Sequence, residues 1–211
     1  MSTAIIGTGG IGSAIARQLG SGGETLRLAS ADAESARSLA AEIGEGASAA
    51  GGNRAALQGS DAVILALRFD VLKNVIDEIS DELPGMLVVV PSNPVTLDAQ
   101  GDVVRVLPSG QSSGEVLAGW LPADARLAMA FGTLPADLLA ASGNRSPERA
   151  VLFYAADDDR ADRDVERLIR TAGFDPVKVG GVGQSTRLEV GGDLHGLTVS
   201  AVEARALIAP T

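Results

Sequence analysis

Residues 4–12, AIIGTGGIG, lie close to the N-terminus and are the strongest indication of the fold of this chain. This stretch joins an apolar, strand-like run, residues 3–6, to a segment in which Ile11, Ala14, Ile15 and Leu19 share one helical face. A GxGxxG pattern between a strand and a helix is typical of the βαβ unit that binds a dinucleotide. The loop therefore predicts a dinucleotide site at the start of an α/β chain.

Each loop glycine has a separate task in such a unit. Gly7 allows the tight turn, Gly9 lets the backbone approach a pyrophosphate, and Gly12 allows the helix to pack closely on the strand. The N–H groups at the helix start then bind the phosphates without any Lys or Arg. The alternative interpretation is a glycine-rich turn that binds no ligand.

The alternation of apolar runs and helix-period segments continues along the chain. It predicts an α/β fold: an N-terminal Rossmann lobe with a doubly wound, mostly parallel sheet, and a smaller C-terminal α/β lobe. We expect the first lobe to span residues 1–122 and the second, which completes the substrate site, residues 123–211, in one compact unit. The further strands are expected at 25–29, within 46–52 by topology alone, and at 62–67, 86–90, 127–131, 150–155 and 176–179.

The last part of the chain is expected to be helical. A tail from Gln184 to Ile208, interrupted by Gly191 and Gly192, contains many Leu, Val and Ala residues. Such a helix is either a homodimer surface or part of the core. We also expect a helix over 114–121.

Composition excludes several classes of protein. The formal charge is 17 − 27 = −10, which disfavours binding to nucleic acid or anionic lipid. Cysteine is absent and His195 is the single histidine, so we expect no thiol chemistry and no metal site. Without a signal peptide, or an apolar run near the ~18 residues that span a bilayer, a cytoplasmic protein without membrane partners is expected.

The nucleotide preference depends on the tip of the second strand, Ser30-Ala31-Asp32. An acid at this tip favours NAD, and a base favours NADP. Asp32, 20 residues beyond Gly12, is either this ribose ligand or the ordinary first acid of the next helix. Arg54 is the nearest basic residue for a 2′-phosphate.

Several motifs, taken together, resemble the NADP-dependent oxidoreductases that act on the deazaflavin coenzyme F-420. The resemblance covers nearly the whole chain, and the later motifs are its more specific part. The matching segments are AIIGTG at 4–9, DAVILAL at 61–67, VVVPSNP at 88–94, SSGE at 112–115, AFGTLP at 130–135 and DDD at 157–159.

The resemblance implies roles for individual residues. Thr8, Gly9, Gly10 and Ile11 would line the pyrophosphate of NADP(H), and Ser30 would meet the adenosine ribose or its 2′-phosphate. The other implied contacts are Leu67 and Arg68, followed by Phe69, on the adenine or nicotinamide side, with Asn93, Pro94, Thr133, Leu134 and Pro135 bordering the nicotinamide and the acceptor. The chain departs from the family where Ala31-Asp32 replaces Arg after Ser30, and where Arg68 replaces a frequent Pro, so NAD(H) stays open as the alternative cofactor.

These observations predict an NAD(P)-dependent oxidoreductase that passes a hydride to F-420, a flavin or another small acceptor. Transfer between two cofactors depends on ring orientation more than on a proton-transferring side chain. The alternatives are a small carbonyl or imine reductase, which needs a proton donor, and a non-catalytic NAD(P)-binding sensor. The donor candidates are His195, expected at the start of the last helix, Tyr154, Glu189, Glu115 and Asp193.

Overall fold

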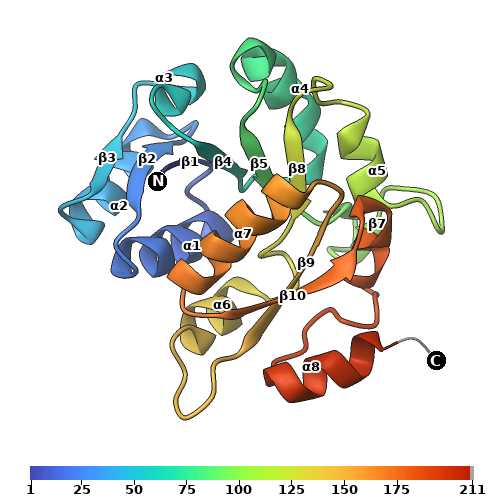
Figure 1. Ribbon diagram of the computed structural model, residues 1–211. Coiled ribbons are helices and arrows are strands. Elements are labelled where there is room, and N and C mark those ends of the chain that lie inside the picture. The colour runs from blue at the N-terminus through green and yellow to red at the C-terminus, as the bar shows by residue number, and fades with distance from the viewer. Residues whose placement is uncertain (210–211) are drawn as a thin grey trace.

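One eight-stranded sheet organises the protein, in the order β10-β9-β8-β5-β4-β1-β2-β3 (Figure 1). The computed structural model describes residues 1–209. The strands of this sheet are β1 Ser2–Ile6, β2 Thr25–Ala29, β3 Ala47–Ala49, β4 Ala62–Leu65, β5 Leu87–Val90, β8 Arg126–Met129, β9 Val151–Ala156 and β10 Asp175–Gly180. The helices are α1 Gly10–Ser21, α2 Ala33–Ile43, α3 Asn53–Leu57, α4 Phe69–Ile79, α5 Ser113–Ala118, α6 Ala136–Ser142, α7 Asp159–Thr171 and α8 Ala201–Ile208, with 3-10 turns η1 Ser80–Glu82 and η2 Val182–Arg187.

The sheet is parallel except where β9 runs antiparallel to β8. From β1 the chain moves outward through β2 and β3, then returns to β4 on the other side of β1 and continues to β5. The strand order therefore reverses between β1 and β4. In an open α/β sheet, ligands bind outside the carboxyl ends of the strands at this switch point. The predicted α/β fold with a mostly parallel sheet is confirmed.

Helices cover both faces of the sheet. One core contains apolar side chains from α1, α2, α6 and α7, and the other contains those from α3, α4, α5 and α8. The strands between them, such as β4 and β5, are buried at every residue because both of their faces are covered. The boundary expected between residues 122 and 123 stays a prediction, and β8 continues the sheet directly beside β5.

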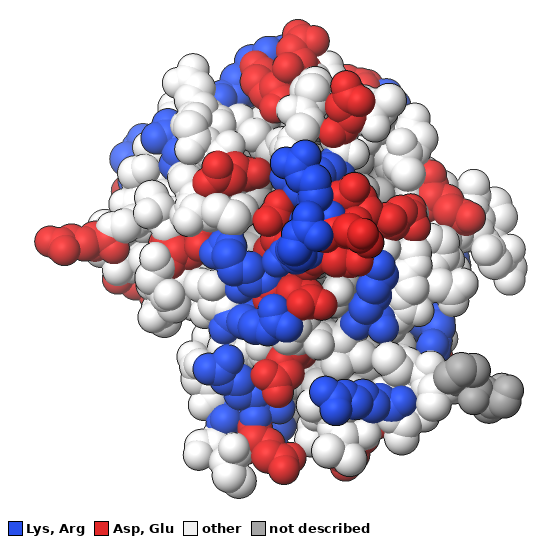
Figure 2. All heavy atoms as spheres, in the orientation of Figure 1, with Lys and Arg blue, Asp and Glu red and all other residues white. Residues whose placement is uncertain are grey.

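The outer face of α7 carries charge of both signs (Figure 2). Asp158 begins this helix, and its carboxylate accepts hydrogen bonds from the amides of Arg160 and Ala161 at 2.9 and 2.8 Å. Further along, Arg170 pairs with Glu166 at 2.8 Å. Capping thus accounts for Asp158, and ion pairing accounts for Glu166 and Arg170.

The C-terminal segment differs from the expected helical tail. Only η2 and α8 are helical within it, and residues 188–199 between them form turns and irregular structure. Gly191 and Gly196 have φ of +89° and +78°, which a helix does not allow. The expected helical tail is therefore wrong for residues 188–199 and is confirmed for α8. Among residues 1–209, no helix is long and apolar enough to cross a membrane.

Two other elements differ from expectation. A short antiparallel hairpin, β6 Val95–Leu97 and β7 Val103–Arg105, follows β5 and was not predicted. The helix expected over 114–121 is shorter, Ser113–Ala118. The third strand, expected by topology alone, is confirmed as β3.

Candidate active site

The glycine loop connects β1 to α1 at the switch point. Gly9 is the N-cap of α1 and has no side chain to cap the helix, and the first turn holds only glycine, isoleucine and serine. The N–H groups of a helix's first turn have no partner within the helix. Together with the positive end of the helix dipole, such groups are suited to bind a phosphate group.

Gly7 and Gly12 have the structural tasks that the sequence predicted, a tight turn and a close approach of helix to strand. Gly7 has φ of +101°, and a Cβ there would lie 2.3 Å from the carbonyl oxygen of Ala66. A Cβ on Gly12 would lie 1.9 Å from the carbonyl oxygen of Gly7. At Gly9, by contrast, no heavy atom of residues 1–209, apart from Gly9 and its two chain neighbours, lies within 4 Å of an added Cβ. Gly7 and Gly12 are thus required by the fold, whereas Gly9 leaves open space for a ligand.

A cleft of about 450 Å³ extends from this loop across the carboxyl ends of β4, β5 and β8. That volume is typical of a small-molecule or cofactor site. Of the predicted site residues, those that line it are Gly9, Gly10, Ile11, Leu67, Arg68, Phe69, Asn93, Leu134, Pro135 and His195. Residues that are 186 positions apart in the chain, such as Gly9 and His195, therefore share one cavity.

The remaining predicted residues lie outside this cleft. Thr8 is buried, and its hydroxyl is 2.7 Å from that of Ser35 on α2. Pro94 is buried beside the hairpin, where its carbonyl accepts a hydrogen bond from the Val106 amide at 2.9 Å. Thr133 is buried and lines a smaller adjoining cavity together with Asn93.

At the tip of β2, Asp32 is the N-cap of α2, and its carboxylate accepts a hydrogen bond from the Glu34 amide at 3.1 Å. The side chain is exposed and lies two residues after Ser30. The capping role is thus confirmed, and the role as ribose ligand stays a prediction. Arg54, considered for a 2′-phosphate, pairs instead with Glu82 at 2.5 Å.

Asn93 joins three segments at the floor of the cleft. Its amide nitrogen donates to the carbonyl of Gly132 at 2.9 Å, and its amide oxygen accepts from the Val190 amide at 2.7 Å. A Cβ on Gly132 would lie 2.2 Å from the carbonyl oxygen of Pro91, so β5 and β8 can end this close together only with glycine there. The preceding Phe131 is buried with φ of +65°, an unusual conformation of the kind that concentrates at functional sites.

We expect Asn93→Leu to separate Val190 from β5, because a leucine side chain can neither donate to Gly132 nor accept from Val190. Loss of two partly buried hydrogen bonds costs about 1–3 kcal/mol of stability. Chemical denaturation would measure it. A variant as stable as the wild type would show that these bonds do not hold the floor of the cleft.

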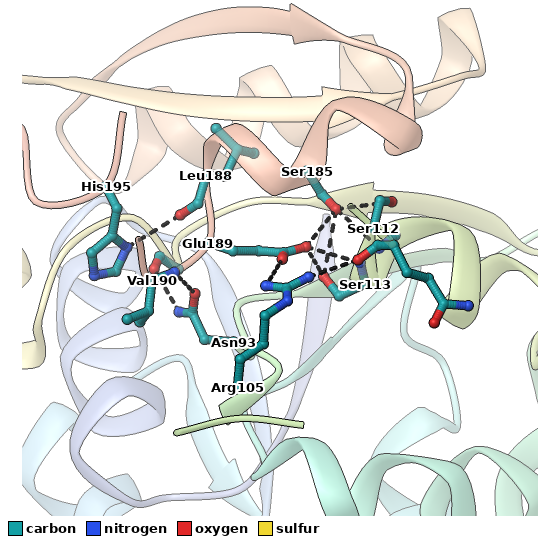
Figure 3. Close-up of polar contacts among 12 residues, drawn as sticks. Asn93, Arg105, Ser112, Ser113, Ser185, Leu188, Glu189, Val190 and His195 are labelled. Carbon is teal, nitrogen blue, oxygen red and sulfur yellow. Dashed lines mark hydrogen bonds and ion pairs between the residues drawn. The ribbon is translucent and has the colours of Figure 1, made fainter. Parts of the chain in front are cut away.

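His195 lies in a turn five residues before Ser200, the N-cap of α8, and not at the start of that helix as expected. Its Nδ1 is 3.2 Å from the carbonyl oxygen of Leu188 (Figure 3). Because a carbonyl only accepts, Nδ1 carries a proton in this contact. Nε2 of the neutral ring is then free of hydrogen and, in the imidazolium form, holds the proton that can leave.

Glu189 is a buried carboxylate beside the cleft (Figure 3). Oε1 accepts hydrogen bonds from the Ser113 amide, the Ser113 hydroxyl and the Ser185 hydroxyl at 2.8, 2.6 and 2.9 Å. Oε2 pairs with Arg105 at 2.6 Å. Burial by itself raises the pKa of Glu189, but these hydrogen bonds outweigh it and hold the pKa below its usual value. Glu189 is therefore anionic at neutral pH, and its interpretation as a proton donor is wrong.

The other donor candidates are not among the residues that line the cleft. Tyr154 is buried, and its hydroxyl donates to Glu166 at 2.8 Å; burial and this bond raise the pKa of the phenol. Asp193 pairs with Arg187 at 2.7 Å, which lowers the pKa of its carboxyl. Glu115 lies in the first turn of α5, where its amide is capped by the Ser112 hydroxyl at 3.0 Å. His195 is thus the donor candidate that lines the cleft.

The lowered pKa of Glu189 predicts a dependence of stability on pH. A carboxyl with a lower pKa in the folded state stabilises the fold above its unfolded pKa of about 4.3, and this contribution is lost as the pH falls through the folded value. We expect the stability difference between wild type and Glu189→Gln to be constant above pH ~5 and to shrink below ~4. Urea unfolding between pH 3 and 7 would measure it, and a difference independent of pH would contradict it.

Several lining residues were not found from the sequence. Ala66, Ser92, Val95, Gly132 and Val190 also line the cleft. Ser92 and Gly132 stand inside the motifs quoted above, which is a signal that could have identified them. Val190 carries no such signal, because its place depends on the turns before α8. Across residues 1–209, no three His, Asp or Glu side chains come together as a metal site.

The sequence and the fold are similar to those of known proteins. Residues 2–94 match the model of the family described as NADP oxidoreductase, coenzyme F-420-dependent. A hypothetical protein from Sinorhizobium meliloti is 31% identical, with 95% of each chain covered and a TM-score of 0.83. No protein in the curated set matches the sequence.

Two more distant structures share the fold. A protein from an Arthrobacter species, assigned as an F-420-dependent NADP reductase, is 18% identical, with a TM-score of 0.79 over 95% of this chain and 99% of that one. A reductive aminase from Aspergillus terreus, in complex with NADPH, is 19% identical, with a TM-score of 0.62 over 87% of this chain and 56% of that one. With its glycine loop, its sheet order and its match to the family model, the chain belongs to the family of coenzyme F-420-dependent NADP oxidoreductases.

Proposed function

We propose that the protein is an NADPH-dependent oxidoreductase that transfers a hydride to an acceptor bound between Asn93 and His195. The observation that carries this proposal is the single cleft, which joins the open helix N-terminus at Gly9 and Gly10 to the far wall at Val190 and His195. Bound NADPH supplies the hydride from its nicotinamide ring.

The residues of the cleft fit such a cofactor. Gly9 leaves space beside the unpaired N–H groups of α1, where a pyrophosphate would bind. The ends of β4 and β5 bring Ala66, Leu67 and Pro91 to the walls, and these apolar surfaces exclude water from a planar ring. The polar group at the floor, Asn93, already bonds to Gly132 and Val190, so the protein fixes the position of the floor before any ligand binds.

We favour a deazaflavin or flavin-type acceptor, since the family to which the chain belongs is described as F-420-dependent. A cleft that mainly orients two rings is sufficient for this reaction. Family membership also favours NADP(H) over NAD(H), although the tip of β2 provides Ser30 and Asp32 and not a basic residue.

The second candidate is a small carbonyl or imine reductase, which His195 favours. Because Nδ1–H is bonded to the Leu188 carbonyl, the proton that the imidazolium can release is the one on Nε2. That proton would pass to the carbonyl oxygen or imine nitrogen as the hydride adds to the carbon. The reductive aminase in complex with NADPH has the same fold.

The first experiment is a parallel titration of the protein with NADPH and NADH, followed by nucleotide fluorescence. We expect tighter binding of NADPH, and then NADPH oxidation with F-420, a flavin or a carbonyl compound from an acceptor panel. Binding without turnover by any acceptor would support a nucleotide sensor. Failure to bind either nucleotide would overturn the proposal.

We also propose that the protein forms a homodimer through α8. Val202 and Leu207 on this helix are 75% and 45% exposed, whereas Ala204 is buried. Sedimentation should give twice the chain mass of 21.3 kDa, and Val202→Glu should reduce it to the monomer value. A monomeric wild type would contradict this proposal.

A further inference from the structure

The wall of the cleft opposite the glycine loop depends on a short segment, residues 188–190, which we call the ledge. Each residue of the ledge makes a different contact. The Leu188 carbonyl accepts from His195, the Val190 amide donates to Asn93, and the Glu189 side chain points away from His195 toward Arg105 and Ser113 (Figure 3). The ledge therefore links two polar side chains of the cleft, His195 and Asn93, to one buried carboxylate.

Regular secondary structure does not hold the ledge in place. It follows η2 directly and leads into turns with positive φ at Gly191 and Gly196. The Leu188 and Glu189 amides both donate to the Ser185 carbonyl, at 2.9 and 3.1 Å, which is a single turn of helix. Such a segment needs side-chain anchors to stay in one position.

Glu189 is that anchor, because its carboxylate bonds to three separate parts of the chain. Ser113 begins α5, Ser185 lies in η2, and Arg105 belongs to β7 of the hairpin. Arg105 also donates to the Gln111 carbonyl at 2.6 Å, so the loop between β7 and α5 belongs to the same network of contacts. The Glu189 side chain is only 3% exposed, which strengthens these charge-assisted bonds.

We infer that Glu189, with Arg105, is a positioning residue for the acceptor end of the active site: it fixes the ledge so that Leu188 selects the Nδ1–H form of His195 and Val190 holds Asn93. Glu189 does not touch the reacting atoms, and it does not line the main cleft. Its contribution to turnover rests on the proposed function, whereas its contribution to the state of His195 does not.

A purely structural role makes a different prediction. A buried ion pair that only stabilises the fold would change the free energy of unfolding and leave His195 as it is. Glu24 provides the matched control, because its side chain is equally buried at 2% exposure and pairs with Arg167 at 2.7 Å. Glu24 directly precedes β2 and so lies at the amino ends of the strands, whereas the cleft lies at their carboxyl ends.

The experiment compares wild type, Glu189→Gln and Glu24→Gln by nitrogen-15 NMR of the imidazole ring at a pH where the ring is neutral. Since His195 is the single histidine, its two ring nitrogens give the only imidazole signals. We expect the Nδ1–H tautomer in wild type and in Glu24→Gln. In Glu189→Gln we expect a mixture with the Nε2–H form, because the amide places a second donor against Arg105 and loosens the ledge. Arg105→Gln, which keeps the carboxylate and its serine bonds, should show a smaller change and provides a readout if Glu189→Gln does not fold.

The kinetic part measures kcat and KM for the acceptor and the NADPH Kd in the same variants. We expect Glu189→Gln to lower kcat about 10-fold or more while the NADPH Kd changes less than 2-fold, because the glycine loop is untouched. An unchanged tautomer in both Glu189→Gln and Arg105→Gln would overturn the inference. A changed tautomer in a protein that oxidises no NADPH would instead refute the proposed function and leave the positioning role intact.

Discussion

Replacing Gly9 with valine is expected to weaken NADPH binding by roughly 100-fold or more while the protein stays folded. Gly9 has φ of −71° and ψ of −168°, an extended conformation that valine adopts readily. Its side chain would project into the space beside the open N–H groups of α1, where the pyrophosphate would bind. Nucleotide fluorescence measures the Kd, and thermal unfolding without nucleotide checks the fold. Tight binding by Gly9→Val would show that the loop is not the phosphate site.

Gly12→Ala is the matched comparison. Its Cβ would meet the backbone oxygen of Gly7 at 1.9 Å, and backbone cannot move aside as a flexible side chain can. We expect a loss of about 2 kcal/mol or more, which lowers Tm by roughly 4–8 °C in a protein of this size. The two variants therefore separate a glycine that a ligand requires from one that the fold requires.

His195→Ala is expected to divide the two acceptor classes. Loss of a general acid lowers the rate by about 100- to 10,000-fold, so reduction of a carbonyl or imine should nearly cease. Reduction of a deazaflavin depends mainly on ring orientation and should change only a few-fold. Steady-state rates with one acceptor of each kind, at fixed NADPH, provide the measurement.

Val190→Ala is the control for that experiment, because Val190 lines the same wall and has no proton to give. It should alter KM for both acceptors to a similar extent. If His195→Ala and Val190→Ala affect carbonyl reduction equally, His195 shapes the cleft and does not supply the proton. The second candidate function would then lose the observation that favours it.

Local patterns were sufficient for the glycine loop and for the strands around it. A turn that needs positive φ at Gly7 and close packing at Gly12 produces a recognisable pattern of consecutive residues. A strand such as β4, which is apolar throughout, does the same. The hairpin β6–β7 has no comparable sequence pattern, since each strand has three residues and several of their apolar side chains are exposed.

The acceptor end of the site shows most clearly which properties local sequence patterns do not predict. The sequence offered both Glu189 and His195 as proton-donor candidates. In the structure one is an anion buried against Ser113 and Arg105, 76 and 84 positions away, and the other lines the cleft. Whether a carboxyl is anionic depends on which donors surround it, and those donors come from distant segments.

The α/β fold and the place of the glycine loop could be predicted from the residues alone, because both follow from the spacing of glycine and apolar residues within short windows. The side chains that face Gly9 across the cleft, namely Asn93, Val190 and His195, became known from the folded chain. Those positions follow from the sheet order and from the turns that replace the expected tail helix. Both are results of long-range packing, which no local pattern records.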